Sequence, residues 1–226
     1  MGVVRLKERK SMDEKQVQEH FRKQVGDYVG LMNRLIPEYE KGQRFLCELI
    51  PFGKEQAINV LDLGSGPGGL SESVLEMYPT AKVHAFDLTE EMLALCQERL
   101  NKYEGRVTFQ QGDYKKDSFG SGYDVILAGL TLHHLTDEER KSIFRVIHDA
   151  LAEDGVFIAR EIIVDEDPYI TEWHYSIWRN FMRSNGENDE FWYNKHKEKD
   201  HPVSIENQLS WLEKAGFKHA ACHWRY

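Results

Sequence analysis

Short apolar runs alternate with amphipathic segments along most of this chain. The runs have the length and composition of buried strands, and they span residues 59–63, 82–86, 107–110, 123–128 and 156–164. Apolar positions recur at helical spacing in the segments between them, and helices are expected over 69–78, from 89 to about 103, over 136–151 and over 204–215. A sixth strand is expected over 217–226. Strands separated by crossover helices predict an α/β fold with a doubly wound, mostly parallel sheet.

Cap and turn residues mark several of the expected boundaries. Thr89 is expected to cap the second helix, and Thr136 with Glu139 forms a capping box at the start of the third. Asp154 and Gly155 are expected to end that helix and to lead into the fifth strand.

The first strand leads directly into a glycine-rich turn, with the sequence Val-Leu-Asp-Leu-Gly-Ser-Gly-Pro-Gly-Gly over residues 60–69. Such a turn lets bare backbone approach a nucleotide-like ligand at a helix N-terminus. The glycines fit both the dinucleotide pattern G-x-G-x-x-G and the tighter G-x-G-x-G. Asp62 favours the second pattern, because a carboxylate under the turn suits a ligand with a cationic amino-acid end rather than a pyrophosphate.

In open sheets of this kind, ligands bind outside the carboxyl ends of the strands. Asp87 ends the second strand, where it can accept hydrogen bonds from both hydroxyls of a ribose; alternatively it is an acid at a helix N-terminus. Asp113 follows the third strand and can accept from the exocyclic amine of adenine, or it can solvate its own turn. Ala128 and Gly129, at the end of the fourth strand, are small enough for a ligand to pass close to the backbone.

Two further features bear on chemistry. His133 and His134 follow the fourth strand and invite a general-base role, but such a pair more often packs and bonds to backbone. Residues 169–193 contain eight aromatic residues among twenty-five and are the best candidate for a lid, with the helical segment 21–50 as the other candidate. The aromatic residues of both segments could equally pack cap helices onto the sheet or form a dimer interface.

Composition narrows the class of protein. The 226 residues are 41% hydrophobic, and no run approaches the roughly 18 apolar residues of a membrane span. The formal net charge of −9 argues against nucleic acid as the main partner. Three widely separated cysteines fit no metal spacing and favour a reduced, cytoplasmic setting, so no metal is expected. The N-terminus is too polar for a signal peptide.

The glycine turn resembles motif I of the class I S-adenosylmethionine (SAM) dependent methyltransferases. The whole chain is similar to the branch that contains the carboxy-SAM synthases and related methyltransferases. That likeness rests on residues 21–39 and 62–69, Asp87 with Met92, residues 112–113, 131–135, 183–186 and 215–217. It implies a Rossmann-like domain over 1–226, with an N-terminal helical cap (1–57), a SAM-binding core (58–164), an aromatic lid (165–203) and a last helix and strand (204–226).

The resemblance implies SAM as cofactor and S-adenosylhomocysteine as product. With the strand-end residues it gives this cofactor set: Tyr39, Asp62, Gly64, Ser65, Gly66, Gly68, Asp87, Leu88, Met92, Asp113, Tyr114, Ala128 and Gly129. The expected substrate residues are Tyr28, His133, His174, Tyr175, Trp178 and Arg179. Candidates for a catalytic group are His133, His134 and Tyr175.

The chain departs from the resemblance in two places. Tyr193 or Asn194 falls where the synthases have a lid arginine that holds the carboxylate of carboxy-SAM, which favours plain methyl transfer. Only one strand of the usual C-terminal hairpin is expected, which leaves a sheet edge open.

The sequence therefore predicts a cytoplasmic methyltransferase acting on a small molecule, mainly by positioning and desolvation, with no membrane or nucleic-acid partner and a homodimer as one option. The alternatives are a carboxy-SAM synthase-like enzyme and a non-catalytic SAM-binding regulator. A nicotinamide oxidoreductase is disfavoured by Asp62 and Asp113.

Overall fold

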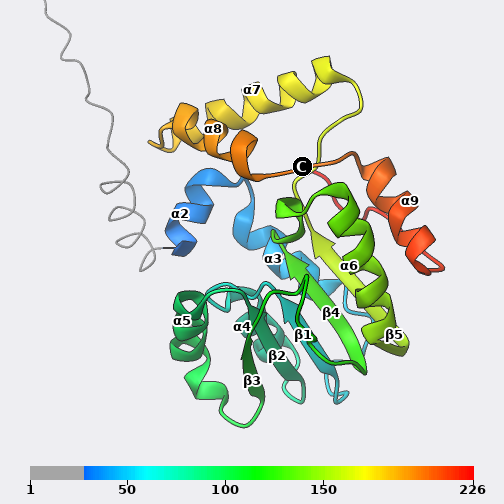
Figure 1. The fold of residues 1–226 in the computed structure, drawn as a ribbon. Coiled ribbons are helices and arrows are strands. Elements are labelled where there is room, and N and C mark those ends of the chain that lie inside the picture. The colour runs from blue at the N-terminus through cyan, green and yellow to red at the C-terminus, as the bar shows by residue number, and fades with distance from the viewer. Residues whose placement is uncertain (1–27) are drawn as a thin grey trace, which may run out of the picture.

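The computed structural model describes residues 28–226 and shows a five-stranded parallel sheet (Figure 1). Its strands are β1 (Asn59–Leu63), β2 (Lys82–Asp87), β3 (Val107–Gln111), β4 (Tyr123–Gly129) and β5 (Leu151–Arg160). Their order is β3-β2-β1-β4-β5, and every neighbouring pair is parallel. The predicted doubly wound sheet is confirmed. Because the strand order reverses between β1 and β4, a ligand site is expected at their carboxyl ends.

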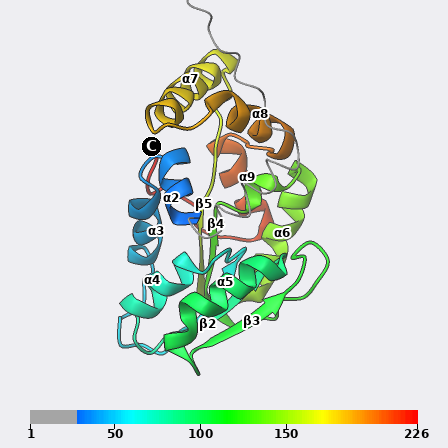
Figure 2. The same cartoon turned by 90° about the vertical axis from the view of Figure 1, so that its left-hand side faces the viewer.

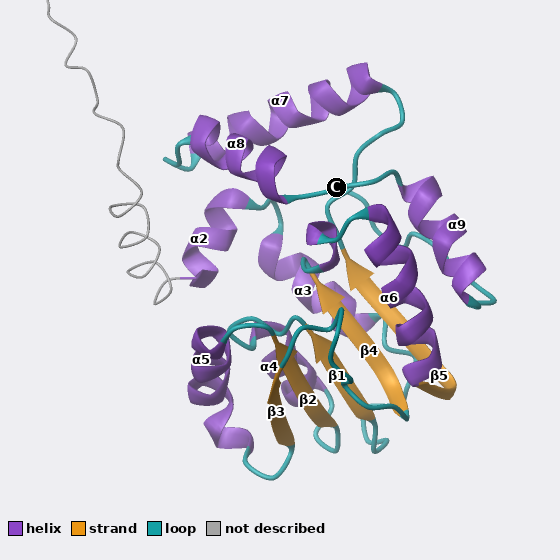
Figure 3. Cartoon of the chain, in the orientation of Figure 1, coloured by secondary structure: helices purple, strands orange, loops and turns teal. Residues whose placement is uncertain are grey.

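Helices cover both faces of this sheet (Figures 2 and 3). They are α2 (Tyr28–Leu35), α3 (Tyr39–Glu48), α4 (Gly69–Met77), α5 (Glu90–Leu100), α6 (Asp137–Ala150), α7 (Pro168–Ser184), α8 (Asp189–Lys199) and α9 (Ile205–Ala215), with the 3-10 turns η1 (Asn101–Tyr103) and η2 (Leu132–His134). Thr89 caps α5, and the reciprocal bonds of the predicted capping box between Thr136 and Glu139 are both present at α6.

Alternation along the strands divides the core between the two faces. Val60 of β1 packs into a cluster with residues of α3, α4 and α5, whereas its neighbour Leu61 packs into a second cluster with residues of α6 and α9. Successive side chains of a strand point to opposite faces, so both faces of a central strand must be apolar. The continuous apolar runs in the sequence have this origin.

A cap of α2, α7 and α8 lies beyond the carboxyl ends of the strands (Figure 1). Leu31 and Leu35 of α2 pack with Met182 of α7, and the indole nitrogen of Trp178 donates to the Leu35 carbonyl oxygen at 2.7 Å. The predicted N-terminal cap and lid are therefore packed against each other. The part of the expected cap that precedes residue 28 lies outside the described residues.

The predicted start of the fifth strand is wrong. β5 starts at Leu151, immediately after α6, so Asp154 and Gly155 lie inside the strand, at an irregularity in its register with β4. A Cβ at Gly155 would lie 2.8 Å from the carbonyl oxygen of Tyr123, so this irregular stretch requires glycine there. The glycine therefore marks a bulge and not a helix end.

The expected sixth strand is also wrong, because residues 217–226 form no strand in the structure. Gly216 ends α9 with a φ of 116°, and Phe217 then packs its ring against Phe157 and His148. Aromatic side chains suit a strand, but here they bury themselves by packing on neighbouring rings. Among the described residues, no helix is long and apolar enough to cross a membrane.

Candidate active site

The glycine turn is held against the end of β2 by its own backbone. The amides of Gly64 and Ser65 both donate to the carbonyl oxygen of Phe86, at 2.8 and 3.0 Å. Gly64 has a φ of 76°, and a Cβ there would collide with the side chain of Thr131. Gly66 also has a positive φ, but a Cβ there would meet nothing within 4 Å. The turn thus packs on one side and leaves Gly66 open to a ligand.

Asp87 ties the turn to the start of α5. One of its carboxylate oxygens accepts from the amide of Gly66 at 2.8 Å, and the other accepts from the amide and hydroxyl of Thr89 at 3.0 and 3.2 Å. Both interpretations of Asp87 from the sequence thus have a physical basis. It is an acid at a helix N-terminus, and it also lies beside the open turn. Its role toward a ribose stays a prediction.

Asp62 lies under the turn and is 1% exposed. One carboxylate oxygen accepts from the hydroxyl of Ser71 at 2.6 Å. Burial raises the pKa of Asp62 to about 6, although the hydrogen bonds from Ser71 act in the opposite direction. The site therefore holds a carboxylate that is costly to ionise and that a cationic ligand group would stabilise.

Replacing Asp62 with Asn is expected to stabilise the fold at neutral pH and to weaken SAM binding. Because the pKa in the folded state exceeds the value of 3.8 for the free group, ionised Asp62 opposes folding above pH 6. Each pKa unit corresponds to about 1.36 kcal/mol, so the gain at pH 7.5 is up to about 3 kcal/mol. It should shrink as the pH falls through about 6 toward 4. Urea unfolding across this range measures the effect, and lower stability of Asp62→Asn at pH 7.5 would contradict it.

A small cavity of about 30 Å³ lies over the glycine turn, between it and the cap. Tyr28 of α2 and Tyr39 of α3 line it on one side, and Asp62 and Gly66 of the core line it on the other. Pockets for ligands of drug size are roughly 300–1,000 Å³. The cavity as it stands is therefore much smaller than one that encloses a ligand of that size.

The acid after β3 adopts the arrangement that the sequence offered as its alternative. Asp113 accepts from the amide of Lys115 at 3.0 Å and pairs with the ammonium group of Lys116 at 2.9 Å. Its adenine role stays a prediction. The other expected cofactor residues lie near the same strand ends: Leu88 and Met92 after β2, Tyr114 after β3, and Ala128 and Gly129 at the end of β4.

A larger cavity of about 1310 Å³ runs along β5, between α3, α7 and α9. His174, Tyr175 and Trp178 from the predicted substrate set line it. Tyr28 lines the small cavity over the turn instead, and Arg179 pairs with Asp189 of α8 at 2.8 Å. The structure thus distributes the predicted substrate residues over several places and does not gather them on one surface.

The two histidines after β4 belong to a network that includes Glu161, in which His133 and Glu161 are buried and His134 is exposed. This carboxylate accepts from the amides of Thr131, Leu132 and His133, at 2.8 to 3.2 Å, and lies 2.9 Å from Nδ1 of His133. Burial lowers the pKa of His133, but the hydrogen bond and charge of Glu161 outweigh it and hold that pKa above the usual value. His133 lines neither of the two cavities described above.

Sequence reasoning missed several members of this network. Glu161 directly follows β5, as Asp87 ends β2, and that position was the available signal. One carboxylate oxygen of Asp200 lies 2.7 Å from Nδ1 of His196, which is four residues earlier in the chain. The other oxygen lies 2.8 Å from Nδ1 of His134. The hydroxyl of Tyr175 lies 3.0 Å from Nε2 of His196. Nothing local in the sequence connects these residues to the loop after β4.

Comparison with known proteins agrees with this geometry. Residues 60–155 match the family model described as a methyltransferase domain. A carboxy-S-adenosyl-L-methionine synthase of Campylobacter lari is 24% identical over 69% of this chain and 66% of its own length. An O-methyltransferase family 2 protein of Planctomyces limnophilus, solved in complex with apigenin, is 20% identical with a TM-score of 0.64, over 94% of this chain and 58% of its own. Human N-acetylserotonin methyltransferase in complex with SAM is 18% identical with a TM-score of 0.59, over 92% and 55% of the two chains.

The strand order and the glycine turn at the carboxyl edge are those of the class I SAM-dependent methyltransferase fold. Residues 60–155 of this chain match the methyltransferase domain, and one of the structural neighbours was solved in complex with SAM. The chain spans about two thirds of the synthase and little more than half of each of the two solved chains.

Proposed function

We propose that this protein transfers the methyl group of SAM to a small-molecule acceptor. The observation that carries the proposal is the pocket over the glycine turn, where buried Asp62, the open Gly66, Tyr28 of α2 and Tyr39 of α3 converge beside Asp87. Bound SAM supplies an electrophilic methyl group on a good leaving group. The protein then has to hold the acceptor in line with that group and exclude water, and no dedicated base is required.

Several observations support a small acceptor. The cap of α2, α7 and α8 covers the carboxyl ends of the strands, and the net charge of −9 disfavours nucleic acid. One structural neighbour was solved with the small molecule apigenin, and another, N-acetylserotonin methyltransferase, is named for a small molecule.

We place the protein in the cytoplasm. We also propose a homodimer contact through the exposed Tyr169, Trp173 and Ile177 on one face of α7.

Carboxy-SAM synthase-like chemistry is the second candidate, since the Campylobacter lari synthase resembles more than two thirds of this chain. This chemistry is disfavoured because Tyr193 or Asn194 falls where the synthases have the arginine that holds the carboxylate. A further cation of the lid, Arg179, is paired with Asp189 at 2.8 Å. Methyl transfer is therefore the first proposal.

Mass spectrometry of the ligand retained on purification, followed by a turnover assay for S-adenosylhomocysteine over a panel of small acceptors, tests this proposal. We expect SAM or S-adenosylhomocysteine to be retained, and S-adenosylhomocysteine to form only when an acceptor is present. Retained carboxy-SAM would favour the second candidate. Retained SAM without turnover over a broad panel would favour a regulatory protein, and retained NAD would overturn the proposal.

A further inference from the structure

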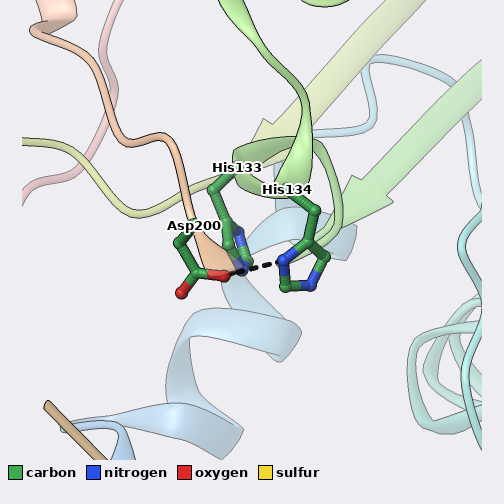
Figure 4. Close-up of side chains that lie close together, drawn as sticks. All are labelled: His133, His134 and Asp200. Carbon is green, nitrogen blue, oxygen red and sulfur yellow. Dashed lines mark hydrogen bonds and ion pairs between the residues drawn. The ribbon is translucent and has the colours of Figure 1, made fainter. Parts of the chain in front are cut away.

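Three side chains with metal-binding atoms meet where the lid returns to the core (Figure 4). His133 and His134 come from η2, and Asp200 follows the last residue of α8. One ligand atom from each lies within 4.8 Å of the others. We propose that these three residues bind a divalent first-row transition metal, with zinc as the best match. Two imidazoles and one carboxylate are a donor set that suits zinc, and a hard ion such as magnesium prefers oxygen ligands.

The distances fit a single ion between the three groups. Nδ1 of His134 lies 2.8 Å and Nε2 of His133 lies 4.0 Å from the same oxygen of Asp200. Zinc bonds to nitrogen and oxygen of about 2.0–2.2 Å place neighbouring ligand atoms of a tetrahedral site roughly 3.4 Å apart. The observed distances lie on either side of this value, so small side-chain rotations would complete the site.

Two of the three ligands are oriented by partners of their own. Glu161 lies 2.9 Å from Nδ1 of His133, which assigns the proton to Nδ1 and leaves the lone pair of Nε2 facing Asp200. The second oxygen of Asp200 lies 2.7 Å from Nδ1 of His196, whose Nε2 lies 3.0 Å from the hydroxyl of Tyr175. Carboxylate partners behind metal-binding histidines are typical of zinc sites, because they fix the tautomer and the ring orientation.

The site has an entry path. The side chain of His134 is 55% exposed, whereas those of His133 and Asp200 are 6% and 11% exposed. One side of the cluster therefore faces solvent, where an ion can enter and where a water molecule can complete its coordination. On the core side, Nε and Nη2 of Arg140 donate to backbone carbonyl oxygens, including that of Leu132, whereas its buried Nη1 has no hydrogen-bond partner among the described residues.

The ion would join two parts of the molecule. His133 and His134 belong to the core, while Asp200 ends the α7–α8 segment that caps the strand ends. Metal binding would thus hold the lid on the core, which is a regulatory role beyond methyl transfer. The sequence predicted no metal because its cysteines fit no metal spacing, and His134 and Asp200, 66 positions apart, form no local motif.

The test is zinc titration of the full chain after treatment with a chelator, followed by calorimetry. All proteins carry Cys222→Ser, which removes an exposed thiol that could bind zinc by itself. We expect one zinc ion per chain, a higher melting temperature with zinc, and no response to magnesium. Because Glu161 is an outer partner, Glu161→Gln should weaken binding by about 10–100-fold. His134→Ala and Asp200→Asn should weaken it by more.

His148→Ala is the matched control, because His148 pairs with Asp149 at 3.1 Å on the surface, and residues 28–226 supply no third ligand there. It should leave zinc affinity unchanged. His134 is exposed, so His134→Ala should fold normally even if Asp200→Asn does not. Absence of zinc binding, or equal affinity in His134→Ala and the parent, would overturn the site. Neither outcome depends on methyl transfer, so the proposed function stands or falls separately.

Discussion

Asp87→Ala is expected to lower the affinity for SAM by at least about tenfold. Three internal hydrogen bonds to this carboxylate hold Gly66 and Thr89, and the proposed ribose contact would add to them. Hydrogen bonds to charged groups contribute about 1.5–3 kcal/mol each, and 1.4 kcal/mol corresponds to a tenfold change in affinity. The variant loses the ligand contact and also the geometry of the turn. Titration calorimetry with SAM measures the change.

Asp124→Ala is the matched control for this prediction. Its carboxylate accepts from the amide of Asn59 at 2.7 Å, at the amino end of β1 and so at the opposite edge of the sheet. Both variants remove a carboxylate that holds backbone, but only Asp87 lies at the ligand edge. Equal SAM affinity in Asp87→Ala and the parent, at temperatures where both are folded, would refute the assignment.

Trp178→Ala is expected to slow methyl transfer by about a hundredfold, more than the loss of either histidine after β4. The indole of Trp178 donates to the Leu35 carbonyl oxygen and lies against the ring of His196, so it joins α7 to α2 and α8. Without it the lid loses a wall of the cavity along β5. A displacement of about 1 Å in the position of an acceptor can cost 10²-fold in rate. Single-turnover rates measure this once an acceptor is found.

Trp173→Ala controls for the loss of an aromatic residue, because Trp173 lies on the same helix and is 55% exposed. Its effect should be small. His133→Ala and His134→Ala should each have little effect on the rate when measured with a chelator, which removes any contribution of bound metal. A general base typically contributes 10²–10⁴-fold. A hundredfold loss in either histidine variant, with SAM affinity and melting unchanged, would identify a base and contradict the positioning mechanism.

Local patterns in the sequence determined most of the fold. The first four strands, the capping box at Thr136 and the helix from Ser204 follow from apolar periodicity and caps, and these depend on residues within one or two turns of each other. The same signals misplaced the start of β5, where Gly155 marks a bulge. They also predicted a strand over 217–226, where ring packing replaces strand pairing.

The sequence by itself thus determined the sheet, the glycine turn and the acids at the ends of β2 and β3. A parallel sheet brings the carboxyl ends of its strands to one edge, independently of the conformation of the loops. Only the tertiary structure decided how the lid is used. It buries Tyr175 against His196, engages Arg179 with Asp189, and brings Asp200 to His134. These contacts join residues that are 10, 21 and 66 positions apart in the chain. They depend on how α7 and α8 return over the sheet, which no local pattern encodes.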